Sequence, residues 1–172
     1  VTDISFVDPA TGIKFRGMTI PEILKKLPKP RGSKIPFVGG LYYLLMIGEV
    51  PTREQAEEVE GEWAKRSQVP DYVYKILKSM PRETHPMVLF SQAVLALQNQ
   101  SEFARKYNEG IKKDVYWEST LEDALNLTAK LPLIAAFIYR MKYYGDTRKP
   151  KYNLRQDYGS NFARMMGVED RK

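Results

Sequence analysis

The stretch STLEDALNLTAKLPLIAAFIYRMKYY (residues 119–144) is the longest run of helical character in the chain. Its first four residues, Ser119-Thr120-Leu121-Glu122, have the pattern of a capping box, in which a hydroxyl and a carboxylate satisfy backbone N–H groups at a helix start. We therefore expect a helix that runs to about Tyr144. Pro132 should kink or loosen it, because proline has no N–H and its ring clashes with the preceding turn.

Start and stop signals on either side of this stretch predict further helices. Thr19 and Thr52 open two more capping boxes, and Gly48 is a left-handed stop. The expected helices span residues 19–27, 41–47, 52–67, 70–80, 86–98 and 101–107, with a last one near Asn161 after a polar loop. About seven helices without an internal repeat predict an all-α, multi-helix fold.

A short β-hairpin is the one exception that we expect near the amino terminus. Residues 3–20 alternate weakly around the turn sequence Asp8-Pro9-Ala10-Thr11-Gly12, with Ile4 and Phe6 before it and Ile13 and Phe15 after it. Alternation on both sides of a turn is typical of two paired strands. Little other strand is expected.

The helix expected over residues 86–98 is apolar around nearly its whole circumference. The residues responsible are Val88, Leu89, Phe90, Ala93, Val94, Leu95, Ala96 and Leu97. A helix that is apolar on all sides has to be buried on all sides. Either a large core or a second subunit must therefore surround it.

Composition and charge exclude several classes of protein. The 172 residues are 43% hydrophobic and 28% charged, as in globular domains, and no linker divides residues 1–172. The net charge of +6 would suit an anionic partner, but acids interleave with bases over residues 54–66, and the most basic stretch, 148–155, is short. We expect no nucleic-acid partner. No apolar run approaches the roughly 20 residues that span a membrane.

Few side chains could carry chemistry. The chain has no cysteine and one histidine, so a metal site would rest on carboxylates alone, and we expect none. His85 lies at a helix start, where a neutral ring making a cap or core hydrogen bond is the expected state. Gly39-Gly40 lacks the spacing of a phosphate-binding loop. The residues by themselves identify no catalytic site.

Segments distributed over nearly the whole chain resemble the citrate synthase family, especially its eukaryotic mitochondrial type. They are Asp8-Pro9, Gly12-Ile13-Lys14-Phe15-Arg16-Gly17, Ile20-Pro21-Glu22, Gly40-Leu41, Leu44-Leu45, Gly48, Pro51-Thr52, Glu62-Trp63-Ala64-Lys65-Arg66, His85-Pro86-Met87, Asn108-Glu109-Gly110-Ile111, Tyr116-Trp117-Glu118, Ala129-Lys130-Leu131-Pro132, Ile138-Tyr139-Arg140 and Asn161-Phe162. Each segment is short, but their order and spacing argue against coincidence.

The resemblance implies a large helical domain, a homodimer in the mitochondrial matrix, and condensation of acetyl-CoA with oxaloacetate to citrate and CoA, a step of the tricarboxylic acid cycle. It implies no metal or redox cofactor. In that family two histidines and an aspartate carry the reaction, and we expect them beyond Lys172. Residues 1–172 would then be the amino-terminal part of the large domain and inactive alone. Two alternatives stay open: 2-methylcitrate synthase, and a non-catalytic dimerising helical module.

The resemblance also suggests one ligand contact. Lys113 falls where the family tends to have an arginine that reaches the CoA phosphates in the neighbouring subunit's site. A lysine keeps the charge but loses the planar fork of donors. The other interpretation is an ordinary exposed lysine beside Lys112. No catalytic residue and no metal ligand is assigned within the chain.

Overall fold

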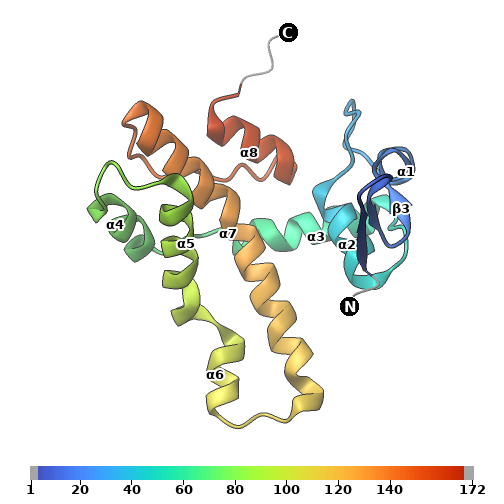
Figure 1. Cartoon of the computed structure of the whole chain (residues 1–172), viewed down its shortest axis with the longest axis horizontal. Coiled ribbons are helices and arrows are strands. Elements are labelled where there is room, and N and C mark those ends of the chain that lie inside the picture. Colours follow the sequence, from blue (N-terminus) through green and yellow to red (C-terminus); the bar gives the residue numbers. More distant parts are fainter. Residues whose placement is uncertain (1–3, 169–172) are drawn as a thin grey trace. The chain divides into compact units, whose positions relative to one another are not determined.

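The structure is a computed structural model and describes residues 4–168. Over that range the chain forms eight α-helices, two short 3₁₀-helices (η) and a three-stranded sheet (Figure 1). Their bounds are β1 Ser5–Asp8, β2 Gly12–Phe15, β3 Met18–Thr19, α1 Ile20–Lys26, α2 Val38–Ile47, α3 Arg53–Arg66, α4 Asp71–Ser79, α5 Pro86–Ala96, η1 Leu97–Gln100, α6 Glu102–Asn108, η2 Lys113–Val115, α7 Tyr116–Tyr144 and α8 Tyr158–Met166. The predicted helical fold with a small β element is confirmed.

The chain divides into two compact units, each described here by itself. The first contains the described residues up to Glu62 together with Leu154–Ser160. The second contains Trp63–Asn153 and the described residues from Asn161 onward.

The first unit begins with the predicted hairpin. Strands β1 and β2 pair antiparallel, and the Asp8 carboxylate closes the turn by accepting hydrogen bonds from the N–H groups of Ala10 (2.9 Å) and Thr11 (2.7 Å). Residue 3, where the alternating pattern starts, lies outside the described residues.

A third strand, β3, extends the hairpin and was not predicted. Arg16 and Gly17 both have positive φ (48° and 77°) and reverse the chain between β2 and β3, as a two-residue hairpin turn requires. An arginine in this conformation gives no turn signal in the sequence. Its guanidinium group donates two hydrogen bonds to the Leu45 carbonyl oxygen, from Nε (3.1 Å) and Nη2 (2.7 Å), which ties the turn to α2.

Helix boundaries in the first unit follow the predicted caps. The Thr19 N–H donates to the Glu22 carboxylate at 2.8 Å, and Thr52 and Gln55 bond each other reciprocally at the start of α3. Gly48 ends α2 with φ 92°. Helix α2 begins at Val38, three residues before the predicted start.

Glu60 joins three segments of the first unit. Its side chain is buried, with the residue only 7% exposed, and its two oxygens accept hydrogen bonds from the N–H groups of Gly39 (3.2 Å) and Tyr158 (2.9 Å) at the starts of α2 and α8. A Cβ at Gly39 would lie 2.7 Å from both the Glu60 Cγ and the Ala56 carbonyl oxygen, so only glycine permits this approach. Burial and the nearby Asp157 raise the pKa of Glu60, although the N–H groups oppose the shift.

Glu60→Ala should therefore lower the free energy of unfolding by about 2 to 4 kcal/mol, because it leaves buried N–H groups without acceptors and opens a cavity. Glu58→Ala is the matched control, since Glu58 is exposed on the same helix, and should change stability by less than about 0.5 kcal/mol. Urea unfolding of both variants measures the difference. Equal effects would show that Glu60 does not hold the segments together.

Helix α7 contributes more buried residues to the core of the second unit than any other helix. Its buried residues pack with buried residues of α4, α5 and α8, and the rings of Tyr74 and Phe137 meet edge to face at 4.8 Å. The helix continues without a break through Pro132 to Gly145, which has a left-handed conformation (Figure 1).

The capping box predicted at Ser119 is wrong. Helix α7 starts at Tyr116, and Ser119 is 1% exposed inside it, with its hydroxyl donating to the Tyr116 carbonyl oxygen. A hydroxyl can bond a carbonyl one turn back as readily as it caps a helix, so the four-residue pattern did not distinguish the two. Glu122, the expected partner in the box, instead binds Arg66.

Helix α5 is not buried on all sides within the described residues. Leu89 and Ala93 face the core, while Met87, Val88 and Leu95 are exposed, Leu95 at 69%. Of the two explanations for its apolar circumference, a surrounding core within this part of the chain is wrong. The exposed side also carries Ser91 and Gln92 and is less apolar than the prediction assumed.

Candidate functional site

Lys113 lies in η2, on the connection between α6 and α7. It is exposed, and its ammonium group makes no hydrogen bond or ion pair with any residue of 4–168. The connection rests on packed rings: Phe103 lies 5.8 Å from Tyr107 and 5.2 Å from Tyr116, centroid to centroid. Lys113 is thus a free cation on a well-packed turn, able to reach an external anion.

His85 has the structural role expected for it. It is the N-cap residue of α5, and its Nδ1 accepts a hydrogen bond from the Met87 N–H at 3.2 Å. Nδ1 must be unprotonated to accept, and the ring is exposed.

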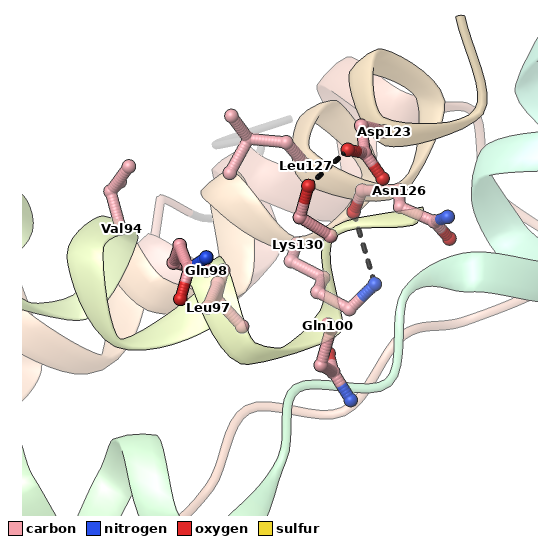
Figure 2. A pocket seen from close by; sticks show the side chains of 9 residues that line it. Val94, Leu97, Gln98, Gln100, Asp123, Asn126, Leu127 and Lys130 are labelled. Carbon is pink, nitrogen blue, oxygen red and sulfur yellow. Dashed lines mark hydrogen bonds between the residues drawn. The ribbon is translucent and has the colours of Figure 1, made fainter. Parts of the chain in front are cut away.

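A pocket of about 210 Å³ in the second unit was not predicted from the sequence (Figure 2). It lies between the α5–η1 segment and α7. Its lining residues are Val94, Leu97, Gln98, Gln100, Ser101, Asp123, Asn126, Leu127 and Lys130. The lining combines aliphatic and amide side chains with one hydroxyl, one carboxylate and one ammonium group.

Lys130 is the unusual member of this lining. The residue is only 7% exposed, and Nζ makes one hydrogen bond, to the Asn126 carbonyl oxygen of its own helix at 3.1 Å (Figure 2). An ammonium group has three N–H donors. Burial lowers the pKa of Lys130, the positive charge of Arg66 lowers it further, and Glu122 opposes the shift.

The two acids nearest to Lys130 in sequence are engaged by other groups. Asp123 accepts hydrogen bonds at the start of α6 from the Ser101 hydroxyl (2.6 Å) and from the N–H of Glu102 (2.7 Å). Glu122 accepts two hydrogen bonds from Arg66, each at 3.1 Å. Lys130 makes no ion pair with a residue of 4–168, and Glu122 is the negative group that acts on its charge.

The sequence around Lys130 carries a signal of its burial. The residue is the only charge in the run Leu125–Tyr139, which is otherwise mostly apolar. A lysine on the buried stripe of a helix is a stronger pointer to a site than an exposed one, because burying an unpaired charge is costly. The prediction instead selected Lys113, which rests on the family resemblance alone.

Replacing Lys130 by methionine should stabilise the fold. Methionine keeps the length of the side chain and removes the buried charge, so the free energy of unfolding should rise by about 1 to 3 kcal/mol at pH 7. The unfolded chain holds the proton up to the ordinary pKa of 10.5, whereas the folded chain releases it earlier. Between the lowered pKa of the folded chain and the ordinary value of 10.5, the free energy of unfolding of the wild type should therefore rise with pH. Over the same pH range, the difference in free energy of unfolding between the wild type and Lys130→Met should shrink.

Urea unfolding at several pH values measures this difference. Lys113→Met is the control, because it removes an exposed charge, and it should change stability by less than about 0.5 kcal/mol at every pH. Destabilisation by Lys130→Met at pH 7 would show that the lysine charge is satisfied in the fold.

Two classes of site are not found within residues 4–168. No group of three or more His, Asp or Glu side chains is arranged to hold a metal ion. No helix in this range is both long and apolar enough to cross a bilayer.

Comparison with solved structures identifies the fold. The citrate synthase of Pyrobaculum aerophilum superposes with a TM-score of 0.77 at 21% identity, over 100% of this chain and 40% of its own. A citrate synthase of Thermoplasma acidophilum, solved in a ternary complex with carboxymethyl coenzyme A and oxaloacetate, gives 0.72 at 17% identity, over 97% and 39%. The fold is therefore that of citrate synthases.

Sequence comparison assigns the family. The family described as "Citrate synthase, C-terminal domain" matches residues 1–172. Citrate synthase 4, mitochondrial, of Arabidopsis thaliana is 45% identical over 99% of this chain, and the mitochondrial citrate synthase of Saccharomyces cerevisiae is 44% identical over 97%. The chain belongs to the citrate synthase family, as its sequence predicted. It spans 36% and 35% of the length of these two relatives.

Proposed function

We propose that this chain is a segment of a citrate synthase, which condenses acetyl-CoA with oxaloacetate to citrate and CoA. The observation that carries the proposal is the family match along all 172 residues, together with identity near 45% to mitochondrial citrate synthases. We place the complete enzyme in the mitochondrial matrix, because the names of those relatives place them in the mitochondrion. We expect it to need no metal or redox cofactor. The segment contributes scaffold, a subunit interface and a phosphate contact.

The 172-residue chain alone should not make citrate. One histidine cannot supply both imidazoles that the reaction of the family uses, one for the enol and one for the oxaloacetate carbonyl. The measurement is CoA thiol release from acetyl-CoA that depends on oxaloacetate, with the full-length protein as the positive control. Thiol release by the chain above a no-protein blank contradicts this prediction.

The same assay on the full-length protein distinguishes citrate synthase from the two alternatives, 2-methylcitrate synthase and a non-catalytic module. Release from acetyl-CoA supports citrate synthase, and a preference for propionyl-CoA would replace it by 2-methylcitrate synthase. No release from either thioester would indicate a non-catalytic module.

We also propose that the exposed side of α5 is a homodimer interface. Met87, Val88 and Leu95 form an apolar surface that this part of the chain leaves open to solvent. A two-fold axis places the same helix of each subunit face to face, so that both surfaces are covered at once.

Leu95→Asp and Val94→Asp should then dissociate the full-length dimer. Each would place an unpaired carboxylate at the interface twice, and each burial costs several kcal/mol. Leu154→Asp is the matched control, because Leu154 is 79% exposed on a loop of the first unit. Sedimentation at low concentration should show monomers for the α5 variants and dimers for the control. A dimer that survives both α5 substitutions is held by another surface.

We further propose that Lys113 binds a phosphate group of acetyl-CoA in the partner subunit's site. Its free ammonium group on a packed turn supports this role, and the family resemblance supplies the ligand. The substitution Lys113→Ala in the full-length enzyme should raise KM for acetyl-CoA about 2- to 30-fold, since one exposed charge-assisted contact contributes roughly 0.5 to 2 kcal/mol. The effect should shrink at high salt.

Steady-state kinetics provides the test. KM for oxaloacetate and kcat should change little, because a phosphate contact far from the reacting carbon affects ground and transition states alike. Lys112→Ala removes the neighbouring exposed charge and serves as the control. Equal KM values for acetyl-CoA in the two variants at low ionic strength would show that Lys113 is an ordinary exposed lysine without a phosphate contact.

A further inference from the structure

Trp117 is an exposed tryptophan at the start of α7. It is 63% exposed, whereas Trp63, the other tryptophan of the chain, is fully buried. Its indole makes no hydrogen bond and no ring contact with a residue of 4–168. A tryptophan has a large, flat apolar ring with one N–H donor, and tryptophan is enriched at binding interfaces. Trp117 therefore has an aromatic face that the described part of the chain does not use.

The other rings on the connection between α6 and α7 are used in packing. Tyr116 lies 5.2 Å from Phe103 and 6.0 Å from Tyr107, measured between ring centroids. These contacts hold the start of α7 against α6 at the tip of the second unit, away from α4 and α8 (Figure 1). Trp117 follows Tyr116 directly, so its backbone is held while its ring stays in solvent. An aromatic face on a packed turn loses little conformational freedom when it binds.

A free cation lies close to Trp117 in the chain. Lys113 precedes it by four residues of helical backbone, which is about one turn, or roughly 6 to 8 Å along the axis. Lys113 makes no ion pair with Asp114 or Glu118, the exposed acids next to Lys113 and Trp117. Glu118 repels an anion placed at Trp117 but does not repel a neutral ring. A matching ligand has a negative group at Lys113 and an uncharged planar group at Trp117.

A phosphorylated nucleotide has this combination of groups. Its base is planar and uncharged, its phosphate is anionic, and one sugar separates them, so two side chains one turn apart can reach both. Bases stack on aromatic side chains because every base has an aromatic face. In CoA, a single ribose joins the adenine to the 3′-phosphate in the same way.

We propose that Trp117 stacks on the adenine ring of acetyl-CoA in the partner subunit's site, while Lys113 holds its phosphate. This inference rests on the proposed function, because the acetyl-CoA ligand and the phosphate contact at Lys113 come from it. It adds recognition of the base, which a phosphate contact alone does not provide. Trp117 then determines specificity for the nucleotide part of CoA and takes no part in the reaction.

Isothermal titration of the full-length protein with CoA and with dephospho-CoA, which lacks the 3′-phosphate, tests the proposal. Trp117→Leu should weaken the binding of both ligands by the same factor, about 5- to 20-fold, because each loses one base stack. This loss should persist at high salt, whereas the loss caused by Lys113→Ala should shrink, since salt screens a charge but not a stack.

Two further variants serve as controls. Trp117→Tyr keeps an aromatic face and should bind CoA within about threefold of the wild type. Tyr143→Leu removes an equally exposed ring, also 63% exposed, at the other end of α7, and should leave CoA binding unchanged. Circular dichroism and sedimentation establish that each variant is folded and has the subunit state of the wild type.

The outcomes separate this inference from the proposed function. A wild-type protein that neither binds CoA nor releases thiol overturns both. A wild-type protein that binds CoA, with folded Trp117→Leu binding it equally well, overturns the stacking contact alone. A weakening that follows only from dissociation of the subunits also overturns it. Weaker binding of both ligands by Trp117→Leu, with recovery in Trp117→Tyr, supports the stacking contact.

Discussion

The buried stretch of α7 from Ala129 to Ile138 is the constraint on which the second unit depends. Leu133, Ile134 and Phe137 lie at helical spacing and contact buried residues of other helices in one core. Each fully buried aliphatic or aromatic side chain contributes about 1.5 to 3 kcal/mol of transfer free energy. The buried residues of α4, α5 and α8 belong to the same core as this stretch, so the positions of these helices depend on it.

This dependence explains why the fold could be predicted well from sequence. The apolar period of the sequence predicts helix α7. Local capping signals predict the shorter helices: Thr52 with Gln55 at the start of α3, and Gly48 in the left-handed conformation at the end of α2. These signals act within four residues and need no knowledge of the tertiary structure. The features missed are those fixed by distant contacts. Arg16 adopts a positive φ while Leu45, 29 residues away, binds its guanidinium group, and Ser119 is drawn into α7.

The candidate sites were harder to predict for the same reason. Lys113 was selected because a family position implied it, and the structure adds that its charge is free and its turn well packed. Lys130 was missed because a lysine in a helix is usually exposed, and only packing shows that this one is covered. The burial of Glu60 was equally hidden, since its partners Gly39 and Tyr158 come from segments 21 and 98 residues away.

Glu60 and Lys130 show two different outcomes for a buried charge. Glu60 meets two N–H donors from the starts of two helices, where the helix dipole also favours a negative charge, so the cost of its burial is partly offset inside the fold. Lys130 meets one carbonyl oxygen, and the nearby acids Glu122 and Asp123 bind other groups. The two buried charges therefore differ in how many backbone groups each one meets. Glu60 joins the starts of α2 and α8 to α3, whereas Lys130 bonds only within its own helix.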